Sequence, residues 1–382
     1  MIFIPIIECL FVTEVIVAFA RGSVNGYIQI LEYISRSPTM WRVGLKVGIY
    51  GGGYAGMELV RLLAGHPEVG VMGVSSRGFA GRGISEVYPQ LAVEGEYVEP
   101  EEIDASTLDA AFVAYGHGES AGAVKELLDA GARLVVDLSA DFRLPDVGVY
   151  EKWYGEHPAP ELLEEAHYGL PEVFGAPRGR LVANPGCYPT AAILALAPVV
   201  RRVGGGMGSV TINALSGVSG AGAKPSVKTH FVTVNESVAP YAISDGSPRH
   251  RHTPEIEIML RRVGKTPEIT FVPHLLPISR GELETIVVEL DDEIPDAGDI
   301  LGWYAEDYEE WRFVEAGPEP PHISHVANTN RVRLSAAVDR RTGKLLLFAA
   351  VDNLLKGAAG GAVQNMNLAL GYPEDLGLEH LR

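Results

Sequence analysis

The sequence predicts an α/β fold with a doubly wound parallel sheet and a second domain. Along residues 43–184, apolar strand patterns alternate with amphipathic helical patterns, which is typical of a parallel sheet. A glycine-rich turn separates the first of these strands from its helix. The chain has 382 residues, more than the usual single domain of about 100 to 200 residues, so a second domain is expected.

Composition narrows the function classes. Hydrophobic residues make up 47% and charged residues 21%, as in ordinary globular proteins. The 49 acidic residues outnumber the 31 Lys and Arg, and the net charge of −18 disfavours nucleic-acid binding. Cys9 and Cys187 are the only cysteines, too few for a disulfide framework or a cysteine-based zinc site. We therefore expect a reducing compartment, the cytoplasm.

Residues 1–39 form an apolar extension that we expect not to belong to the native fold. Glu8 and Glu14 interrupt its apolar run, and a charge near a bilayer centre costs about 2.5–3.5 kcal/mol. No basic residue precedes that run, so it does not resemble a secretory signal, and no membrane association is expected. Met40, directly before a strand pattern, is the expected natural start. The alternative is a genuine extension that packs on the surface or serves in assembly.

The glycine-rich turn predicts a nucleotide site. Gly51, Gly53 and Gly56 form G-x-G-x-x-G, with Tyr54 and Ala55 between the last two glycines. Such glycines allow a tight turn, let a pyrophosphate approach the backbone, and let the helix lie close to the strand. A loop without a ligand is the alternative, but the flanking strand and helix favour a Rossmann-type dinucleotide site.

The end of the second strand selects the cofactor. An acidic residue there would bind the ribose 2′-hydroxyl of NAD, whereas an arginine accommodates the 2′-phosphate of NADP. This chain has Ser75, Ser76 and Arg77 at that place and no acidic residue. The sequence therefore predicts NADP or NADPH, unless Arg77 is an ordinary solvated arginine.

A cysteine lies in a second strand–turn–helix unit. A strand ends at Asn184, a Pro-Gly turn follows, and Cys187 stands just before a helix expected to open at Pro189. Unpaired amides at a helix N-terminus favour a thiolate and can hold an oxyanion. We therefore predict a nucleophile rather than a buried structural cysteine.

A thiol nucleophile needs a partner that moves protons. His250 and His252 precede Thr253-Pro254-Glu255, which reads as the start of a helix. Histidine titrates near neutral pH, so one of the two is the expected general acid and base. A metal site formed with His322 and His325 is an alternative, but no acidic or thiol ligand accompanies them at fitting spacing. No metal is expected.

Several passages together resemble a known family from Val43 to Leu378. The chain is similar to the N-acetyl-γ-glutamyl-phosphate reductases, NADPH-dependent enzymes of arginine biosynthesis. The first turn departs from the family pattern G-A-S-G-Y-[TA]-G, because this chain is one residue shorter there. The matching passages are SSRGFAGRGISEVYP, VVDLSADFRL, HYGLPEV, NPGCYPTAAILAL, SGVSGAGAKPSVKTHFVTVNES, HRHTPEIE, FVPHLLPISRGEL and VDNLLKGAAGGAVQNMNLALG.

The resemblance implies a domain plan. A Rossmann-type NADP-binding domain would comprise residues 43–184 and a returning helix within 353–371. Residues 185–352 would form an α+β catalytic and oligomerisation domain with a mixed or antiparallel sheet. Relatives of this shape pair through the second sheet, so a homodimer or homotetramer is expected.

The resemblance also implies a reaction: reductive dephosphorylation of an acyl phosphate through a thioester on Cys187. His252 would move the proton of the thiohemiacetal oxygen, with His250 as second choice. Arg143 would hold the leaving phosphate, unless it forms a structural ion pair. Further substrate-binding residues would be Ser139, Asn184 and Glu236; further cofactor-binding residues would be Ser219, Gly220 and Asn353.

Three other functions fit part of the pattern. A carrier-protein-linked aminoadipyl or glutamyl phosphate reductase of lysine biosynthesis would share the glycine turn, the cysteine and the histidines. An NADPH-sensing protein would need the glycine turn but not Cys187. A Cys–His hydrolase or acyltransferase would use Cys187 and His252 but leave the glycine turn without a purpose.

Overall fold

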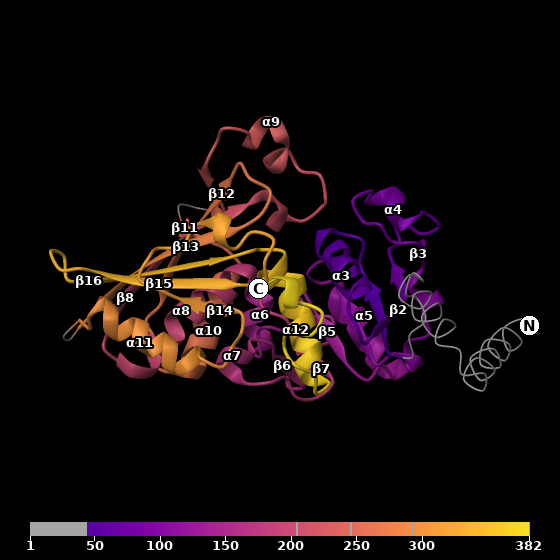
Figure 1. The fold of residues 1–382 in the computed structure, drawn as a ribbon, viewed down its shortest axis with the longest axis horizontal. Helices are drawn as coiled ribbons and strands as arrows, with labels where there is room; N and C mark the ends of the chain where they lie inside the picture. Colours follow the sequence, from indigo (N-terminus) through magenta and orange to yellow (C-terminus); the bar gives the residue numbers. More distant parts are fainter. Residues whose placement is uncertain (1–43, 204, 245–246, 292–293, 382) are drawn as a thin grey trace, which may run out of the picture. The chain divides into compact units, whose positions relative to one another are not determined.

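The computed structural model describes residues 44–203, 205–244, 247–291 and 294–381. The expectations for residues 1–39, for a start at Met40 and for Cys9 lie outside the described residues. All described residues belong to one compact unit, which contains two seven-stranded sheets (Figure 1).

The first sheet is parallel throughout. Its strand order is β3-β2-β1-β4-β5-β7-β6, so β1 is flanked by β2 on one side and β4 on the other. The predicted doubly wound sheet is confirmed. The strands are β1 (Leu45–Tyr50), β2 (Val69–Ser75), β3 (Tyr97–Val98), β4 (Ala110–Val113), β5 (Val135–Asp137), β6 (Ala166–Tyr168) and β7 (Leu181–Ala183).

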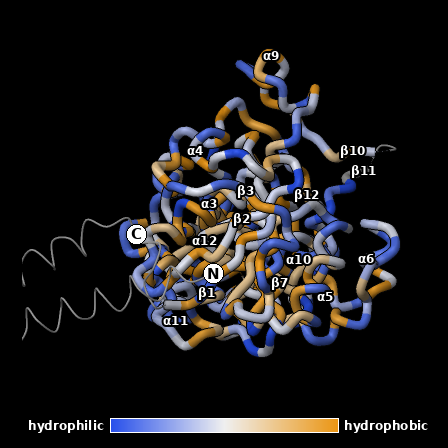
Figure 2. Tube along the Cα trace, turned by 90° about the vertical axis from the view of Figure 1, so that its right-hand side faces the viewer, coloured by the Kyte–Doolittle hydropathy of each residue, from blue (hydrophilic) through white to orange (hydrophobic). Residues whose placement is uncertain are grey.

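Helices cover both faces of this sheet. On one face, α3 (Tyr54–Ala64) and α12 (Gly360–Ala369) bury Leu59, Val363 and Met366 against β1 and β4. On the other face, α5 (Ser120–Ala130) buries Val124 and Leu128. Figure 2 shows hydrophobic residues gathered along these inner strands and helices. Shorter helices are α4 (Ile84–Val87), α6 (Val147–Tyr154) and α7 (Pro171–Phe174).

The second sheet is mixed, as expected, with the order β14-β15-β16-β13-β8-β12-β9. Its central strands alternate between buried and half-buried residues. Helices α8 (Cys187–Val203), α10 (His252–Val263) and α11 (Ala297–Tyr308) share one apolar core with its buried face. The strands are β8 (Met207–Gly217), β9 (Ala239–Pro240), β12 (Ile269–Leu276), β13 (Glu282–Leu290), β14 (Val314–Ala316), β15 (Val332–Asp339) and β16 (Lys344–Val351).

The opposite face of the second sheet remains partly exposed. Thr285 and Val287 of β13 and Leu346 and Phe348 of β16 alternate with the buried residues of those strands and are only half-buried. A sheet face of this apolar character is a candidate surface for association with another molecule.

The chain passes from the second sheet back to the first close to the elbow that carries Cys187. The chain returns to the first sheet through a π-helical turn at Leu355–Ala359, which continues into α12. A Cβ at Gly357 would lie 2.7 Å from Cβ of Cys187, so this turn passes directly against the thiol residue. The segment after β8 leaves the sheet and carries α9 (Phe231–Val234) outward (Figure 1). It includes a small hairpin of β10 (Ile243–Ser244) and β11 (Ser247–Pro248).

Two glycines of the first turn provide a matched test of stability. A Cβ at Gly56 would collide with the backbone carbonyl oxygen of Gly51, whereas a Cβ at Gly53 meets no described atom within 4 Å. Because backbone cannot move aside cheaply, Gly56→Ala should lower the free energy of unfolding by about 1–3 kcal/mol. Gly53→Ala should change it by less than about 0.5 kcal/mol. Urea unfolding of both variants measures the difference, and equal losses would contradict the close-packing argument.

Candidate active site

The first cavity lies beyond the ends of the neighbouring strands β1 and β4. From there the chain continues to helices on opposite faces of the sheet, α3 after β1 and α5 after β4. Ligands bind doubly wound sheets at this point, beyond the carboxyl ends of the strands. Here the cavity has a volume of about 280 Å³. The residues that line it are Gly51, Gly52, Gly53, Ser76, Arg77, Ala114, Tyr115, Gly116 and Glu119. The glycine turn and Arg77, predicted separately, thus border one cavity.

The backbone around this cavity explains the glycines. Gly51 has a φ of 133°, a conformation that side chains disfavour, and it donates a hydrogen bond to the Ser75 carbonyl oxygen. The Ser75 side chain is buried, with its oxygen 3.3 Å from the Tyr115 hydroxyl. Ser75 is the last residue of β2 and supports the cavity from beneath. Ser76 and Arg77, which follow the strand, line the cavity.

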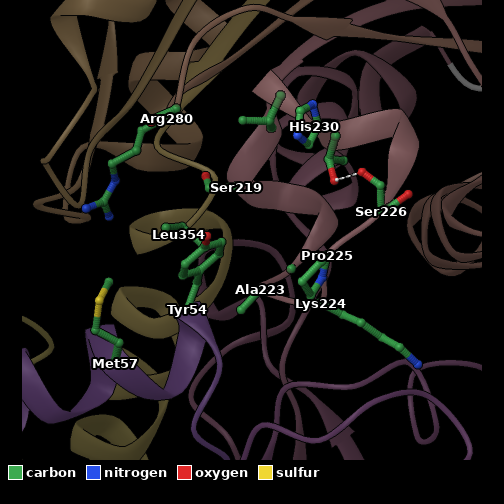
Figure 3. A pocket seen from close by; sticks show the side chains of 14 residues that line it. Tyr54, Met57, Ser219, Ala223, Lys224, Pro225, Ser226, His230, Arg280 and Leu354 are labelled. Carbon is green, nitrogen blue, oxygen red and sulfur yellow. Dashed lines mark hydrogen bonds between the residues drawn. The ribbon is translucent and has the colours of Figure 1, made fainter. Parts of the chain in front are cut away.

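A second cavity, of about 450 Å³, lies beside the start of α3. Figure 3 shows Tyr54 and Met57 of α3 on one side, with Ser219, Lys224 and Arg280 from the second half of the chain around them.

Asn353 fixes the loop that borders this second cavity. Its side chain donates to Oγ of Ser219 at 2.9 Å and accepts from the Gly281 amide at 2.7 Å. The predicted cofactor residues Tyr54 and Ser219 thus line this cavity, Asn353 positions it, and Gly220 lines the cavity at the thiol.

Cys187 is the first residue of α8, so the helix begins earlier than the expected Pro189. The carbonyl oxygen of Gly186 accepts hydrogen bonds from the backbone N–H and the hydroxyl of Thr190, which closes the first turn. Pro189 is tolerated there because amides in the first turn have no helical acceptor. The thiol is half-buried.

The cavity at Cys187 has a volume of about 490 Å³ and contains both predicted histidines. The ring centroids of His250 and His252 lie 4.8 Å apart. A Cβ at Gly186 would lie 2.5 Å from Nε2 of His252, so the ring packs against the elbow one residue before the thiol. Other residues that line this cavity include His117, Tyr188, Ser216, Lys228, Tyr241, Arg249 and Arg251.

The two imidazoles differ in their hydrogen bonds. Nδ1 of His250 accepts from the backbone N–H of His252 at 3.2 Å, and its Nε2 lies 3.4 Å from the Tyr241 hydroxyl. Nδ1 of His252 is buried and finds no hydrogen-bond partner among the described residues. His252 is therefore the imidazole that the surrounding protein holds less firmly by hydrogen bonds.

Both histidines of the site have lowered pKa values. Burial lowers the pKa of His250 to about 4, and nearby Arg251 and His117 add to this effect. Burial, together with His250 and Arg143, lowers the pKa of His252 well below its ordinary value. Both imidazoles are therefore neutral at neutral pH.

The thiol does not show the lowered pKa that its place at a helix N-terminus suggests. Burial raises the pKa of Cys187 well above its ordinary value, and the negative charge of Glu282 adds to the increase. Because both histidines are neutral, no imidazolium offsets these effects. Desolvation and a carboxylate outweigh the partial charge of the helix end.

Arg143 lies beneath the elbow, and each of its three side-chain nitrogens makes a hydrogen bond. Its Nε donates to the Asn184 carbonyl at 2.7 Å, one terminal nitrogen donates to the Leu138 carbonyl, and the other pairs with Glu255 at 3.2 Å. Only 4% of the Arg143 side chain is exposed. Its predicted grip on phosphate stays a prediction, and the alternative of a structural ion pair describes these contacts.

Glu255 completes that arrangement from the first turn of α10. One of its oxygens accepts from the Gly186 amide at 3.0 Å and from the Tyr168 hydroxyl at 2.8 Å. The ion pair therefore ties together the 139–143 loop, the cysteine elbow and the helix that carries His252.

The other three predicted substrate residues do not line the cavity at Cys187. Ser139 is buried and donates to Asp137 at 2.7 Å. Asn184 is buried, and its side-chain oxygen accepts from Asn365 at 3.0 Å. Glu236 is exposed, with a φ of 57°, on the segment after α9. None of these three is among the described residues that line the Cys187 cavity.

Sequence reasoning gave no role to three cations at this cavity, Lys228, Arg249 and Arg251. All three are exposed. Arg249 and Arg251 flank His250 in the sequence, and that alternation of cations and histidines is a usable signal. His117 follows β4 at the carboxyl edge of the first sheet, where ligands of such sheets bind.

The described residues show neither a candidate metal cluster nor a candidate membrane-spanning helix. Residues 44–203, 205–244, 247–291 and 294–381 contain no group of three His, Cys, Asp or Glu side chains suited to a metal ion. Within these same ranges, no helix combines the length and the apolar character needed to cross a bilayer.

Family models match both halves of the chain. One described as semialdehyde dehydrogenase, NAD binding domain, matches residues 46–177, and one described as semialdehyde dehydrogenase, dimerisation domain, matches residues 187–353. A curated N-acetyl-γ-glutamyl-phosphate reductase of Rubrobacter xylanophilus is 80% identical over 341 residues, which cover 89% of this chain and 100% of the relative. That of Desulforudis audaxviator is 46% identical, over 87% of this chain and 98% of the relative.

Solved structures share the fold at lower identity. Aspartate semialdehyde dehydrogenase II of Vibrio cholerae, complexed with ASA, matches with a TM-score of 0.63 and 19% identity, over 86% of this chain and 98% of its own. Aspartate semialdehyde dehydrogenase of Candida albicans, with NADP, matches with a TM-score of 0.57 and 15% identity, over 85% of this chain and 98% of its own.

The buried ion pair predicts a large loss of stability when one partner is removed. Glu255→Gln leaves Arg143 as an unpaired buried charge, which should lower the free energy of unfolding by about 3–5 kcal/mol. Adding Arg143→Met should recover part of that loss, because the orphaned charge disappears. Urea unfolding of the two single variants and the double variant measures the coupling. Additive losses would show that the pair does not act as a unit.

Proposed function

This chain belongs to the N-acetyl-γ-glutamyl-phosphate reductases of the semialdehyde dehydrogenase family, and from that membership we propose that it reduces N-acetyl-γ-glutamyl phosphate to the semialdehyde with NADPH. The observation that carries the proposal is the 80% identity to such a reductase over that relative's full length. The site supports it, because a thiol at a helix start shares a cavity with two histidines. The reaction would serve arginine biosynthesis, in the cytoplasm as the cysteine usage suggests.

The nucleotide cavity fits NADPH. A Cβ at Gly53 would meet no described atom within 4 Å, so space exists for a pyrophosphate to approach the backbone at the start of α3. Arg77 borders the same cavity and can pair with a 2′-phosphate. The cavity lined by Tyr54 and Ser219 shares Ser226 and Thr229 with the cavity at Cys187 and would take the nicotinamide end. When bound, NADPH supplies the hydride.

The cavity at Cys187 fits a dianionic acyl phosphate. Lys228, Arg249 and Arg251 place three cations on its lining, although the whole chain has a net charge of −18. Local positive charge in an acidic protein favours an anionic substrate at that place. We assign the phosphate to these exposed cations. Arg143, which is buried and bonded through each of its nitrogens, would position the elbow from below.

Cys187 then acts as the nucleophile. Its sulfur attacks the acyl carbon, the bond to the phosphate oxygen breaks, and a thioester and inorganic phosphate result. Amides at the start of α8 are placed to stabilise the oxyanion that forms. Hydride reduction of the thioester carbonyl gives a thiohemiacetal, which releases the semialdehyde as the carbon–sulfur bond breaks.

His252 is our choice for the proton on the thiohemiacetal oxygen. Its ring lies against Gly186 beside the thiol, and its Nδ1 is free of described partners. Its pKa is lowered in the ligand-free site. An anionic substrate in the cavity would raise this pKa back toward its ordinary value. His250, held by Tyr241 and by the backbone of His252, would position the substrate.

We further propose that two copies pair through the exposed face of the second sheet. The family model for residues 187–353 is that of a dimerisation domain. The half-buried Val287, Leu346 and Phe348 on that face would be covered by the same face of a second copy. A homotetramer would need a second contact surface.

The proposed reaction predicts reversible dehydrogenase activity. With N-acetylglutamate semialdehyde and phosphate or arsenate, the protein should reduce NADP⁺, and NADP⁺ should be used in preference to NAD⁺. Cys187→Ser should abolish turnover, because the weaker hydroxyl nucleophile cannot replace the thiol. The increase in absorbance of the reduced nicotinamide measures both. Activity only with a carrier-protein-linked semialdehyde would instead assign the lysine-type reaction.

Exchange of each histidine tests the proton assignment. His252→Asn should lower kcat by about 10²–10⁴-fold, the usual contribution of general acid–base catalysis, with little change in NADPH binding. His250→Asn should act mainly on KM, through substrate positioning. Steady-state kinetics of the two variants decides between them: a far larger loss of kcat in His250→Asn would reverse the assignment.

A further inference from the structure

Glu282 is a buried carboxyl group that the mechanism above does not use. It is the first residue of β13 and has an exposure of 0%. Neither of its carboxylate oxygens has a hydrogen-bond partner among the described residues. The Cys187 thiol and the Ser216 hydroxyl nevertheless lie close enough to lower its pKa. A buried carboxyl group of this kind needs an explanation, because leaving it unpaired is costly.

The strand register fixes this placement. Glu282 pairs with Ser216 of the neighbouring β8, and Ser216 lines the same cavity as Cys187. Alternation along β13 directs Glu282 and Glu284 to the face that packs on α8. Gly357 leaves room for Cys187 on the other side, since a Cβ there would collide with the thiol residue. The carboxyl group thus belongs to the sheet on which the cavity at Cys187 is built.

The two imidazoles in the cavity are poor acceptors for the thiol proton. Both imidazoles are neutral and are weak bases, because burial lowers their pKa values. Burial instead raises the pKa of Glu282, which makes its carboxylate a stronger base than an ordinary one. With its pKa raised to about 8, this carboxyl group titrates near neutral pH, as an efficient general base should.

From this geometry we propose that Glu282 takes the proton of the Cys187 thiol when the sulfur attacks the acyl phosphate. The sulfur–carbon bond forms, the carbon–oxygen bond to phosphate breaks, and the S–H proton remains on the Glu282 carboxyl group. When the carbon–sulfur bond of the thiohemiacetal breaks, the carboxyl group returns this proton to the thiolate. Glu282 is then a catalytic residue. The assignment rests on the proposed reductase reaction.

Several other charged and titratable groups act on this pair. Asp352 raises the pKa of Glu282, whereas Arg143 lowers that of Cys187. Burial and the nearby Glu282 raise the pKa of Glu284 well above its ordinary value. The remaining groups facing the thiol are Tyr188, Tyr241, His117, His250, His252 and the cations Lys228, Arg249 and Arg251.

Two isosteric variants separate a catalytic from a structural role. Glu282→Gln removes both the base and the negative charge, so kcat for acyl-phosphate reduction should fall about 10²-fold or more. At the same time, alkylation of Cys187 by iodoacetamide in the substrate-free enzyme should begin at a lower pH, because the repelling carboxylate is gone. Glu284→Gln makes the same replacement at the next buried position on the same face, away from the thiol, and should leave kcat unchanged.

Alkylation is followed by mass spectrometry of the Cys187 peptide, which distinguishes it from Cys9. The opposite changes, slower turnover with easier alkylation, support the proposal. Unchanged kcat in Glu282→Gln, an unmoved alkylation profile, or an equal loss of kcat in Glu284→Gln would each overturn it.

The wild-type enzyme provides a second measurement should Glu282→Gln fail to fold. Its alkylation rate should rise with pH in two steps, because the thiol and the carboxyl group titrate as a pair. A single step would contradict the pairing. Failure of the wild-type enzyme to reduce the N-acetylated acyl phosphate would refute the proposed function instead, since the alkylation profile needs no substrate.

Discussion

The buried ion pair of Arg143 and Glu255 is the contact on which the site depends. It joins three segments that lie far apart in the sequence: the loop after β5, the elbow before α8 and the first turn of α10. A buried pair contributes little net stability when compared with apolar side chains, but its geometry is demanding. Its value here is positional, because it fixes the amide of Gly186 and the helix that carries His252 relative to the thiol.

The ligand-free site avoids charge at its reacting groups and places charge at its border. Burial keeps the two imidazoles neutral and the thiol protonated, whereas Lys228, Arg249 and Arg251 lie exposed on the cavity lining. A thiolate is the form that alkylating and oxidising agents attack. A thiol that stays protonated until substrate binds is therefore protected from alkylation and oxidation in the substrate-free enzyme.

Local patterns were sufficient for much of this architecture. The glycine turn, the alternating strands and helices and the Cys187 elbow are contiguous in sequence, so their spacing alone predicts their geometry. The sequence predicts the start of α8 two residues late, because proline favours the first helical turn, whereas the Gly186 carbonyl closes that turn earlier. Long-range pairing was out of reach: Glu255 lies 112 residues from Arg143. Glu282 reads as an ordinary strand residue until register places it beside the sulfur.

The return of the chain through α12 has a consequence for synthesis. Val363 and Met366 belong to the same apolar core as Val47 and Leu59, yet the segment between β7 and α12 contains the entire second sheet. At about 5–20 residues per second, a ribosome needs roughly 9 to 35 s to make that segment. During this interval one face of the first sheet is covered by α3 alone and lacks α12. The nascent chain should therefore depend on chaperones more than two consecutively encoded domains would.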